Sequence, residues 1–225
     1  MGSSELEKKI GVVFKNKNLL KEALIHRSYL NENPKWGRHN ERLEFLGDSV
    51  LELVTSIFLF KKYPEETEGR LTVLRAALIN YQMLARVARE ISLENHILLS
   101  KGEAKDTGKG REAILADAFE ALLAAIYLDR GYEAAENFIH KFLLPHLEEI
   151  EKKQLYRDPK SLLQEMVQEQ FKLTPNYKVL EETGPDHQKI FRVGVYFGEK
   201  LAAEGKGLSK QEAEVNAAGQ ALSSL

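Results

Sequence analysis

The chain has no cysteine among its 225 residues. This absence excludes disulfide bonds, thiolate metal sites and thiol nucleophiles, and it suits a reducing compartment. No apolar run approaches the roughly 20 residues that a membrane-spanning helix needs. The N-terminus, Met1-Gly2-Ser3-Ser4-Glu5, lacks the basic and apolar regions of a secretory signal. We therefore expect a protein that does not associate with membranes.

An excess of one charge is also missing. The chain carries 32 Lys and Arg against 34 Asp and Glu, so its net charge of −2 does not by itself indicate a nucleic-acid binder. Hydrophobic residues make up 43% and charged residues 29%. These fractions are typical of a folded globular protein rather than a disordered one.

The hydrophobic pattern predicts two domains. Residues 4–150 favour an all-helical domain, because apolar residues recur at helical spacing and no segment alternates like a strand. Residues 151–157 are charged and lack an apolar period, which predicts a linker. Residues 158–225 favour a small α+β domain of order α-β-β-β-α, with Asp158 as N-cap and Pro159 at the first helical position. The helices expected in the first domain span residues 5–10, 18–29, 40–63, 71–91, 112–128 and 132–150, the last interrupted near Pro145.

An acidic row opens the longest predicted helix. Glu41, Glu44 and Asp48 are spaced i, i+3 and i+7, which places them on one helical face beside an apolar stripe. Like charges at such spacings destabilise a bare helix by a few tenths of a kcal/mol, roughly. Spacing alone leaves two interpretations open: a solvated acidic face, or a row that needs a bound cation or basic side chains.

A second acidic pair, Asp117 and Glu120, lies in a segment otherwise made of Ile, Leu, Ala and Phe. Carboxylates are costly to bury unless something compensates them. If the two helices pack together, these acids and the first row form an all-oxygen cluster that suits hard cations such as Mg2+ or Mn2+. The alternative is that Asp117 or Glu120 caps a helix or pairs with an arginine, for instance Arg42 or Arg75. A di-iron bundle is disfavoured, because the Glu-x-x-His pattern is absent: Gly47 and Leu123 stand where its histidines would be.

Two residues inside the first acidic row raise a separate question. Glycine within a helix costs about 1 kcal/mol relative to alanine, so Gly47 predicts a close backbone approach or room for a neighbouring group. Phe45 is a large apolar residue outside the main stripe. It is either ordinary core or the anchor of a contact with a second copy of the chain.

Glu41-Arg42-Leu43-Glu44-Phe45-Leu46-Gly47-Asp48 resembles the signature motif of the ribonuclease III family. Asp117-Ala118-Phe119-Glu120-Ala121-Leu122 resembles that family's second acidic motif, and residues 158–225 resemble its double-stranded-RNA-binding domain. The likeness covers nearly the whole chain, in the domain order of the bacterial enzymes. It implies a Mg2+-dependent endonuclease, active with Mn2+ as well, that hydrolyses double-stranded RNA and leaves 5′-phosphate ends with short 3′ overhangs.

The resemblance also implies roles for individual residues. Glu44, Asp48, Asp117 and Glu120 would be the metal ligands, with Asp48 and Glu120 catalytic and Glu120 the most directly so. Glu41 and Glu68 match acidic positions near the family's active site. Phe45 and Gly47 would lie at the interface of a homodimer.

The second domain matches the family's pattern with departures. Ser161, Gln164, Glu165 and Gln168 occupy the helix positions that touch the RNA minor groove. His187, in Gly184-Pro185-Asp186-His187, would probe the next minor groove. Lys210 and Gln211 lie where the family has two phosphate-contacting lysines. This domain has eight basic and ten acidic side chains, so we expect weak, salt-sensitive RNA binding.

The resemblance further implies a cytoplasmic enzyme that processes ribosomal RNA precursors and other structured transcripts and uses no organic cofactor. One rival from another class is a non-catalytic duplex-RNA-binding protein that keeps the helical domain for dimerisation. The presence of all four expected metal ligands disfavours that rival. An iron-storing or redox bundle is a third interpretation, disfavoured by the missing histidines.

Overall fold

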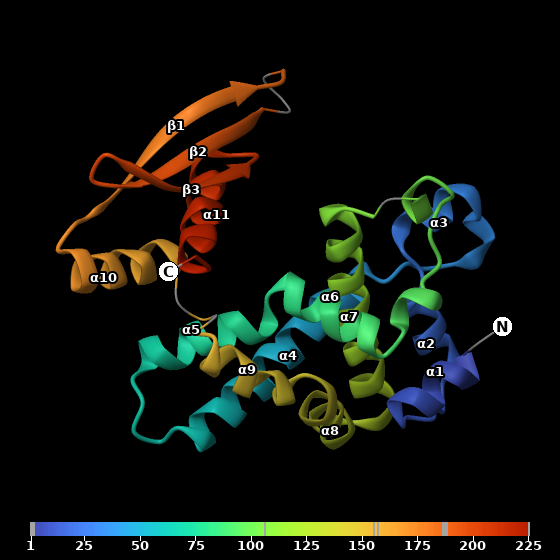
Figure 1. The fold of residues 1–225 in the computed structure, drawn as a ribbon. Helices are drawn as coiled ribbons and strands as arrows, with labels where there is room; N and C mark the ends of the chain where they lie inside the picture. The colour runs from blue at the N-terminus through green and yellow to red at the C-terminus, as the bar shows by residue number, and fades with distance from the viewer. Residues whose placement is uncertain (1–2, 106, 155, 157, 186–188, 225) are drawn as a thin grey trace. The chain divides into compact units, whose positions relative to one another are not determined.

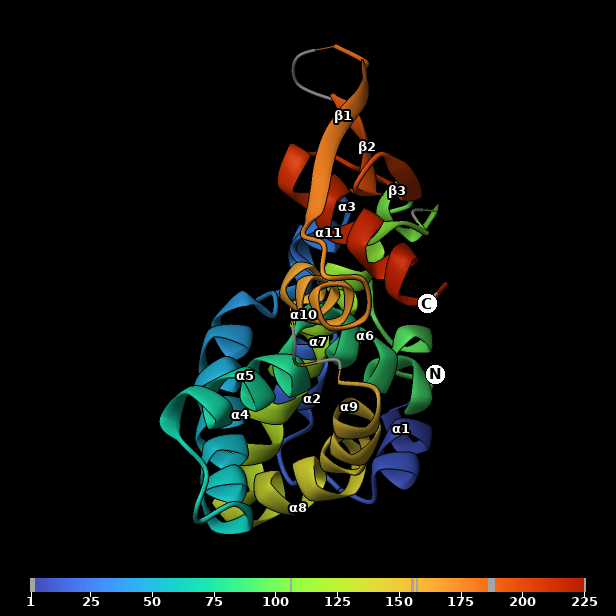
Figure 2. The ribbon, with the colours of Figure 1, turned by 60° about the vertical axis from the view of Figure 1, so that its left-hand side comes forward.

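The computed structural model describes residues 3–105, 107–154, 156, 158–185 and 189–224 and divides into two compact units, residues 1–156 and 157–225. Figures 1 and 2 show a helical first unit and a second unit that contains both strands and helices. Across the described residues, no helix is both long and apolar enough to cross a bilayer.

The first unit consists of α-helices joined by short 3-10 turns. Its α-helices are α1 (Ser3–Ile10), α2 (Lys17–Ala23), α3 (Arg27–Glu32), α4 (Glu41–Lys62), α5 (Glu68–Ile79), α6 (Tyr81–Glu90), α7 (Lys109–Arg130), α8 (Tyr132–Phe142) and α9 (Leu147–Lys152). The 3-10 turns are η1 (Pro34–Trp36), η2 (Leu93–Asn95), η3 (Glu103–Lys105) and η4 (Leu144–His146).

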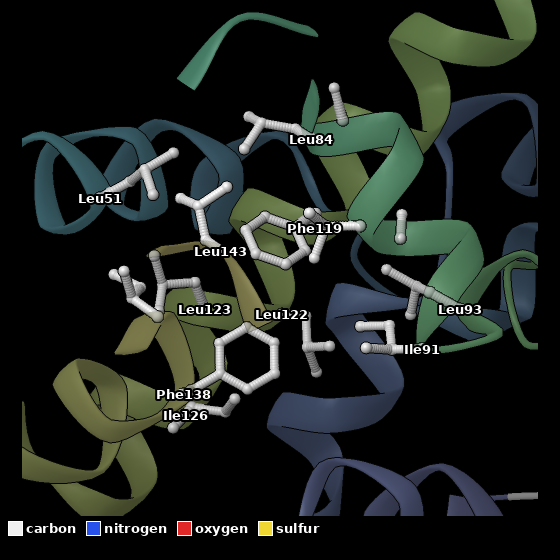
Figure 3. Packing of buried hydrophobic residues seen from close by; sticks show 14 of the residues in the cluster. Leu51, Leu84, Ile91, Leu93, Phe119, Leu122, Leu123, Ile126, Phe138 and Leu143 are labelled. Atoms are coloured by element: carbon white, nitrogen blue, oxygen red, sulfur yellow. The ribbon is translucent and has the colours of Figure 1, made fainter. Parts of the chain in front are cut away.

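Helix α7 is the centre of this unit. It packs against α2, α4, α6 and α8, and from Ile114 to Ile126 every residue except Asp117 and Glu120 is buried. A helix that is apolar on all sides belongs in a core. Figure 3 shows Phe119 of α7 and Phe138 of α8 within that core, with ring centroids 5.4 Å apart.

Helix α4 crosses α7 with no room for a side chain at Gly47. A Cβ built on Gly47 would lie 1.9 Å from the carbonyl oxygen of Glu120 and 2.5 Å from its carbonyl carbon. The close backbone approach predicted for Gly47 is therefore present. It is made to α7 of the same chain.

Two expected helices are broken in the structure. Residues 18–29 form α2 and α3, because Leu24 and His26 pair with Leu98: the Leu98 N–H donates to the Leu24 carbonyl (2.8 Å) and the His26 N–H to the Leu98 carbonyl (3.1 Å). Residues 71–91 form α5 and α6, because Asn80 ends the first and caps the second. Its Nδ2 donates to the Ala77 carbonyl (2.9 Å) and its Oδ1 accepts from the Met83 N–H (2.9 Å).

The expected linker is partly structured. Glu151 and Lys152 are the last residues of α9, and the ring of Tyr156 lies 3.6 Å from the Arg70 guanidinium carbon, measured to the ring centroid. A charged segment without an apolar period can still continue a helix when its neighbours pack. Leu147 and Ile150 of α9 are buried.

The second unit has the predicted α-β-β-β-α order. Its elements are α10 (Pro159–Phe171), β1 (Pro175–Thr183), β2 (Ile190–Phe197), β3 (Lys200–Gly207) and α11 (Lys210–Leu222). The strands form an antiparallel sheet in the order β1-β2-β3. The core joins Leu163 and Val167 of α10, Val195 of β2 and the alanines of α11.

We expect Gly47→Ala to destabilise the first unit by about 1–3 kcal/mol or more, because the new methyl group forces α4 away from α7. The measurement is the thermal unfolding midpoint of the full chain. Gly69→Ala is the matched control, because Gly69 lies in α5 with nothing within 4 Å of a built Cβ. Similar midpoints for the two variants would contradict this account of Gly47.

Candidate active site

Three carboxylates from two helices meet beside the α4–α7 crossing. Glu44 lies in the first turn of α4, and Asp117 and Glu120 lie in α7. One carboxylate oxygen of each lies within 4.8 Å of the others. The spacing of three residues places both α7 acids on the side that faces α4. We call Glu44, Asp117 and Glu120 the carboxylate cluster.

The cluster raises the pKa of its own members. Burial, followed by the charges of Asp48, Asp117 and Glu44, raises the pKa of Glu120 to about 8. The pKa of Glu44 is raised by burial and then by Asp117, Glu41 and Asp48. Burial and the charge of Glu41 raise the pKa of Asp117. The shared direction means that burial and like charges disfavour the ionised forms, and no charge of a described basic residue offsets them.

The basic side chains that the structure describes do not neutralise the cluster. None of the three acids forms an ion pair with any residue that the structure describes. Arg75 instead donates to the Ser56 hydroxyl at 2.8 Å, so the pairing of Asp117 or Glu120 with this arginine is not realised. Three convergent oxygens, without nitrogen or sulfur, fit a hard divalent cation such as Mg2+ or Mn2+.

Asp48 lies outside the cluster although it is on the same helix as Glu44. Its side chain is exposed, and the three-residue group of converging oxygens does not include it. Its charge nevertheless raises the pKa of both Glu44 and Glu120. Asp48 therefore contributes negative potential at the margin of the cluster.

Glu41 and Glu68 lie in different surroundings. Glu41 lines a hollow of about 360 Å3 together with Glu44 and Asp117, and it pairs with Arg27 at 3.4 Å. Glu68 begins α5 and accepts from the Thr72 hydroxyl at 3.1 Å. It lines a separate hollow of about 630 Å3 between α4 and α5. A single chain therefore groups Glu41, but not Glu68, with the carboxylate cluster.

The close contact of Gly47 is made within its own chain, and its assignment to the dimer interface stays a prediction. Gly47 is buried against the Glu120 backbone of its own chain, because only a residue without a Cβ fits that crossing. Phe45 differs from it, since its side chain is 79% exposed. It is therefore not core, and the interpretation of Phe45 as an intermolecular anchor stays open.

Two further residues of this site had no role assigned from the sequence. Asn40 and His26 line the 360 Å3 hollow beside Glu44 and Asp117. Asn40 is one helical turn before Glu44, and this spacing could have indicated from the sequence that Asn40 lies beside the carboxylates. His26 is brought there by the break between α2 and α3, which local periodicity does not predict.

The second unit presents a polar face on α10. Gln164, Glu165 and Gln168 are exposed. Ser161 is exposed as well, and both its N–H (2.9 Å) and its hydroxyl (3.1 Å) donate to the Asp158 carboxylate. These four positions share one side of the helix, as the spacing predicts. His187 lies outside the described residues.

Residues at the start of α11 already form an ion pair and hydrogen bonds within the second unit. Lys210 pairs with Glu182 of β1 at 2.9 Å. Ser209 caps the helix by accepting from the Glu212 N–H at 3.1 Å, and the Glu212 carboxylate accepts from the Leu208 N–H at 2.7 Å. Gln211 is exposed. The one lysine expected at this helix start is therefore held by an acid of the neighbouring strand.

Known proteins match both units. Residues 16–147 match the Ribonuclease-III-like family model, and residues 159–225 match the double-stranded RNA binding motif. Ribonuclease 3 of Protochlamydia amoebophila (strain UWE25) is 45% identical over 97% of this chain and 90% of that protein. Ribonuclease 3 of Dehalococcoides mccartyi (strain ATCC BAA-2266 / KCTC 15142 / 195) is also 45% identical, over 97% of this chain and 93% of that protein.

A solved structure gives the same relationship for the first unit. The nuclease domain of ribonuclease III from Campylobacter jejuni aligns with a TM-score of 0.59 and 40% identity, covering 64% of this chain and 99% of that one. Together with the carboxylate cluster and the α-β-β-β-α unit, these matches identify the chain as a member of the ribonuclease III family of double-stranded-RNA endonucleases.

Proposed function

We propose that this endoribonuclease hydrolyses double-stranded RNA with the help of Mg2+ held by Glu44, Asp117 and Glu120. The observation that carries the proposal is the carboxylate cluster itself: three oxygens within 4.8 Å of one another, set in an apolar helix core and without a basic partner among the described residues. The exposed side chain of Asp48 would rotate in as a fourth ligand.

The chemistry that Mg2+ supplies when bound is activation of a water molecule and neutralisation of charge on the phosphate being cut. Glu120 carries a proton below its pKa of about 8, and it must lose that proton to bind a cation. Cation binding near neutral pH therefore releases a proton. Glu41 and Asp48 add negative potential that attracts the cation, and Glu41 stays oriented by Arg27.

A homodimer is the second part of the proposal. Phe45, Leu53 and Phe60 are 79%, 52% and 71% exposed, and their spacing places them on one face of α4. Leu53 lies midway between the two phenylalanines. An antiparallel pair of α4 helices, related by a two-fold axis near Leu53, would bring Phe45 of each chain to the Phe60 end of the other.

The hollow of about 630 Å3 between α4 and α5 is at that end. Phe60, Leu71 and Glu68 line it. We propose that it receives Phe45 of the partner subunit. The partner's Glu68 would then lie beside Phe45 and near Glu44, which explains why Glu68 is separate from the cluster within one chain. Flexibility in a region involved in dimer formation has been described for the Campylobacter jejuni nuclease domain.

The second unit supplies duplex binding in this proposal. Ser161, Gln164, Glu165 and Gln168 would contact the minor groove, and Lys210 and Gln211 the phosphates at the start of α11. We assign His187 to the next minor groove from the sequence alone. The proposed domain limits are residues 4–150 for the endonuclease domain and residues 158–225 for the RNA-binding domain.

The remaining expectations follow from the family. They are 5′-phosphate ends with short 3′ overhangs, replacement of Mg2+ by Mn2+, and processing of ribosomal RNA precursors and other structured transcripts in the cytoplasm.

Cleavage of a long RNA duplex in Mg2+ tests the cluster. We expect Glu120→Gln to reduce cleavage at least 100-fold, because losing one ligand of such a site commonly removes several kcal/mol of charge stabilisation. Glu112→Gln is the matched control, since Glu112 lies on the same helix but pairs with Arg89. Equal cutting by Glu120→Gln and wild type would remove Glu120 from the mechanism. A wild-type chain that binds duplexes without cutting would favour a non-catalytic role.

The dimer is tested by the mass of the protein in sedimentation equilibrium at micromolar concentration. Phe45→Ala removes the proposed anchor and should shift the chain from dimer toward monomer. Leu128→Ala is the control, because Leu128 of α7 is 51% exposed and is not part of the proposed interface. An unchanged mass for Phe45→Ala would sink the anchor proposal.

RNA binding in the absence of divalent cations tests the role of Lys210. Glu182→Gln frees Lys210 from its ion pair, so we expect a several-fold tighter complex and a log K against log salt slope steeper by up to about 0.9. Glu199→Gln makes the same charge change at an exposed residue of the β2–β3 turn. If both variants bind equally, net charge and not the Lys210 pair governs the affinity.

A further inference from the structure

Asn40 is a buried polar residue whose side chain has no partner among the described residues. It is 1% exposed, and its Nδ2 is buried without a hydrogen-bond acceptor. Leaving a buried donor unsatisfied is unfavourable, and most such groups in proteins are paired. A residue kept in this state therefore needs an explanation.

Helix capping does not provide that explanation. Asn40 precedes α4 with helical angles, φ −77° and ψ −14°, and makes no side-chain cap hydrogen bond. Its backbone is nevertheless fixed. The Asn40 N–H donates to the Ile25 carbonyl (2.9 Å), and the Asn40 carbonyl accepts from the N–H groups of Leu43 (2.8 Å) and Glu44 (2.9 Å). These hydrogen bonds hold the Asn40 backbone at the start of α4, and its amide is buried there.

The surroundings of Asn40 leave few acceptors for its Nδ2. Asn40 lines the 360 Å3 hollow together with His26, Glu41, Glu44 and Asp117. The Nδ1 of His26 accepts the Ser28 N–H at 3.3 Å. The neutral ring therefore carries its proton on Nε2, and neither nitrogen is left to accept from Asn40. Glu41 is paired with Arg27. Of the other acids that line this hollow, Glu44 and Asp117 belong to the carboxylate cluster and Glu103 lies in η3. None of these acids accepts a hydrogen bond from the Asn40 Nδ2.

We propose that Asn40 is a positioning residue of the cation site. Its Nδ2 donates to an oxygen atom, of a water molecule or of an RNA phosphate, that a cation on the carboxylate cluster holds in the hollow. This inference rests on the proposed function and deepens it. The spacing i, i+4 places Asn40 on the same face of α4 as Glu44, so the donor and the ligand are held by one rigid turn.

The test measures Mn2+ affinity of the full chain without RNA and, in parallel, the unfolding midpoint of the metal-free protein. Asn40→Ala should leave the metal-free midpoint unchanged or slightly raised, because the amide has no partner to lose. It should weaken Mn2+ binding about 10-fold, the effect typical of removing an outer-shell partner.

Asn80→Ala is the matched control. Asn80 also precedes a helix, but its amide makes two hydrogen bonds within the protein. This variant should lower the metal-free midpoint by a few degrees and leave Mn2+ affinity unchanged. The opposite patterns separate a positioning role from an ordinary structural one.

The source of the oxygen decides which measurement responds. A water ligand predicts weaker Mn2+ binding by Asn40→Ala without RNA. A phosphate ligand predicts unchanged binding without RNA but about 10-fold more Mn2+ for half-maximal cleavage. The inference is overturned if both stay unchanged, or if Asn40→Ala destabilises the metal-free chain as Asn80→Ala does. If wild type binds no Mn2+, or Glu44→Gln binds it as wild type does, the proposed cation site fails as well.

Discussion

The contact between Gly47 of α4 and the Glu120 backbone of α7 determines the geometry of the candidate active site. Because a Cβ at Gly47 would lie 1.9 Å from the Glu120 carbonyl oxygen, the two helices cross at a distance that only glycine permits. Glu44 lies one turn before Gly47, and Asp117 one turn before Glu120. The same crossing that packs the core therefore brings three carboxylates together.

The close packing of the three carboxylates lowers the stability of their ionised form, although the proposed chemistry requires that form. Burial and mutual repulsion raise the pKa of all three acids, so the metal-free cluster is favoured in a partly protonated form. The proposed cation would reverse that preference, because it would bind only the ionised carboxylates. Its binding free energy would then add to the stability of the α4–α7 crossing. A rigid core on the far side of α7 keeps the acids together in spite of their repulsion.

The sequence was sufficient to predict most of the helices, the three strands and the two groups of acids, because these depend on local spacing. Apolar periodicity gave the long helices and the α-β-β-β-α order, and i, i+3 spacing indicated that Asp117 and Glu120 share a face. Tertiary contacts were not predictable in this way. Leu98 breaks the expected helix at residues 24–26, and Gly47 lies against the Glu120 backbone of α7. The orphan amide of Asn40 and the Lys210–Glu182 pair depend on segments far apart in the chain.

The Lys210–Glu182 pair affects how the second unit, which has a net negative charge, can bind negatively charged RNA. Lys210 is held by Glu182, and Arg192 by Glu181 and Glu204. A phosphate that binds Lys210 must displace the carboxylate, so part of its attraction is spent on separating the existing pair. Association then becomes an exchange of one anionic partner for another. Such an exchange gains little from each phosphate, so a second subunit that offers a second binding unit to the same duplex would strengthen the complex more than one added lysine.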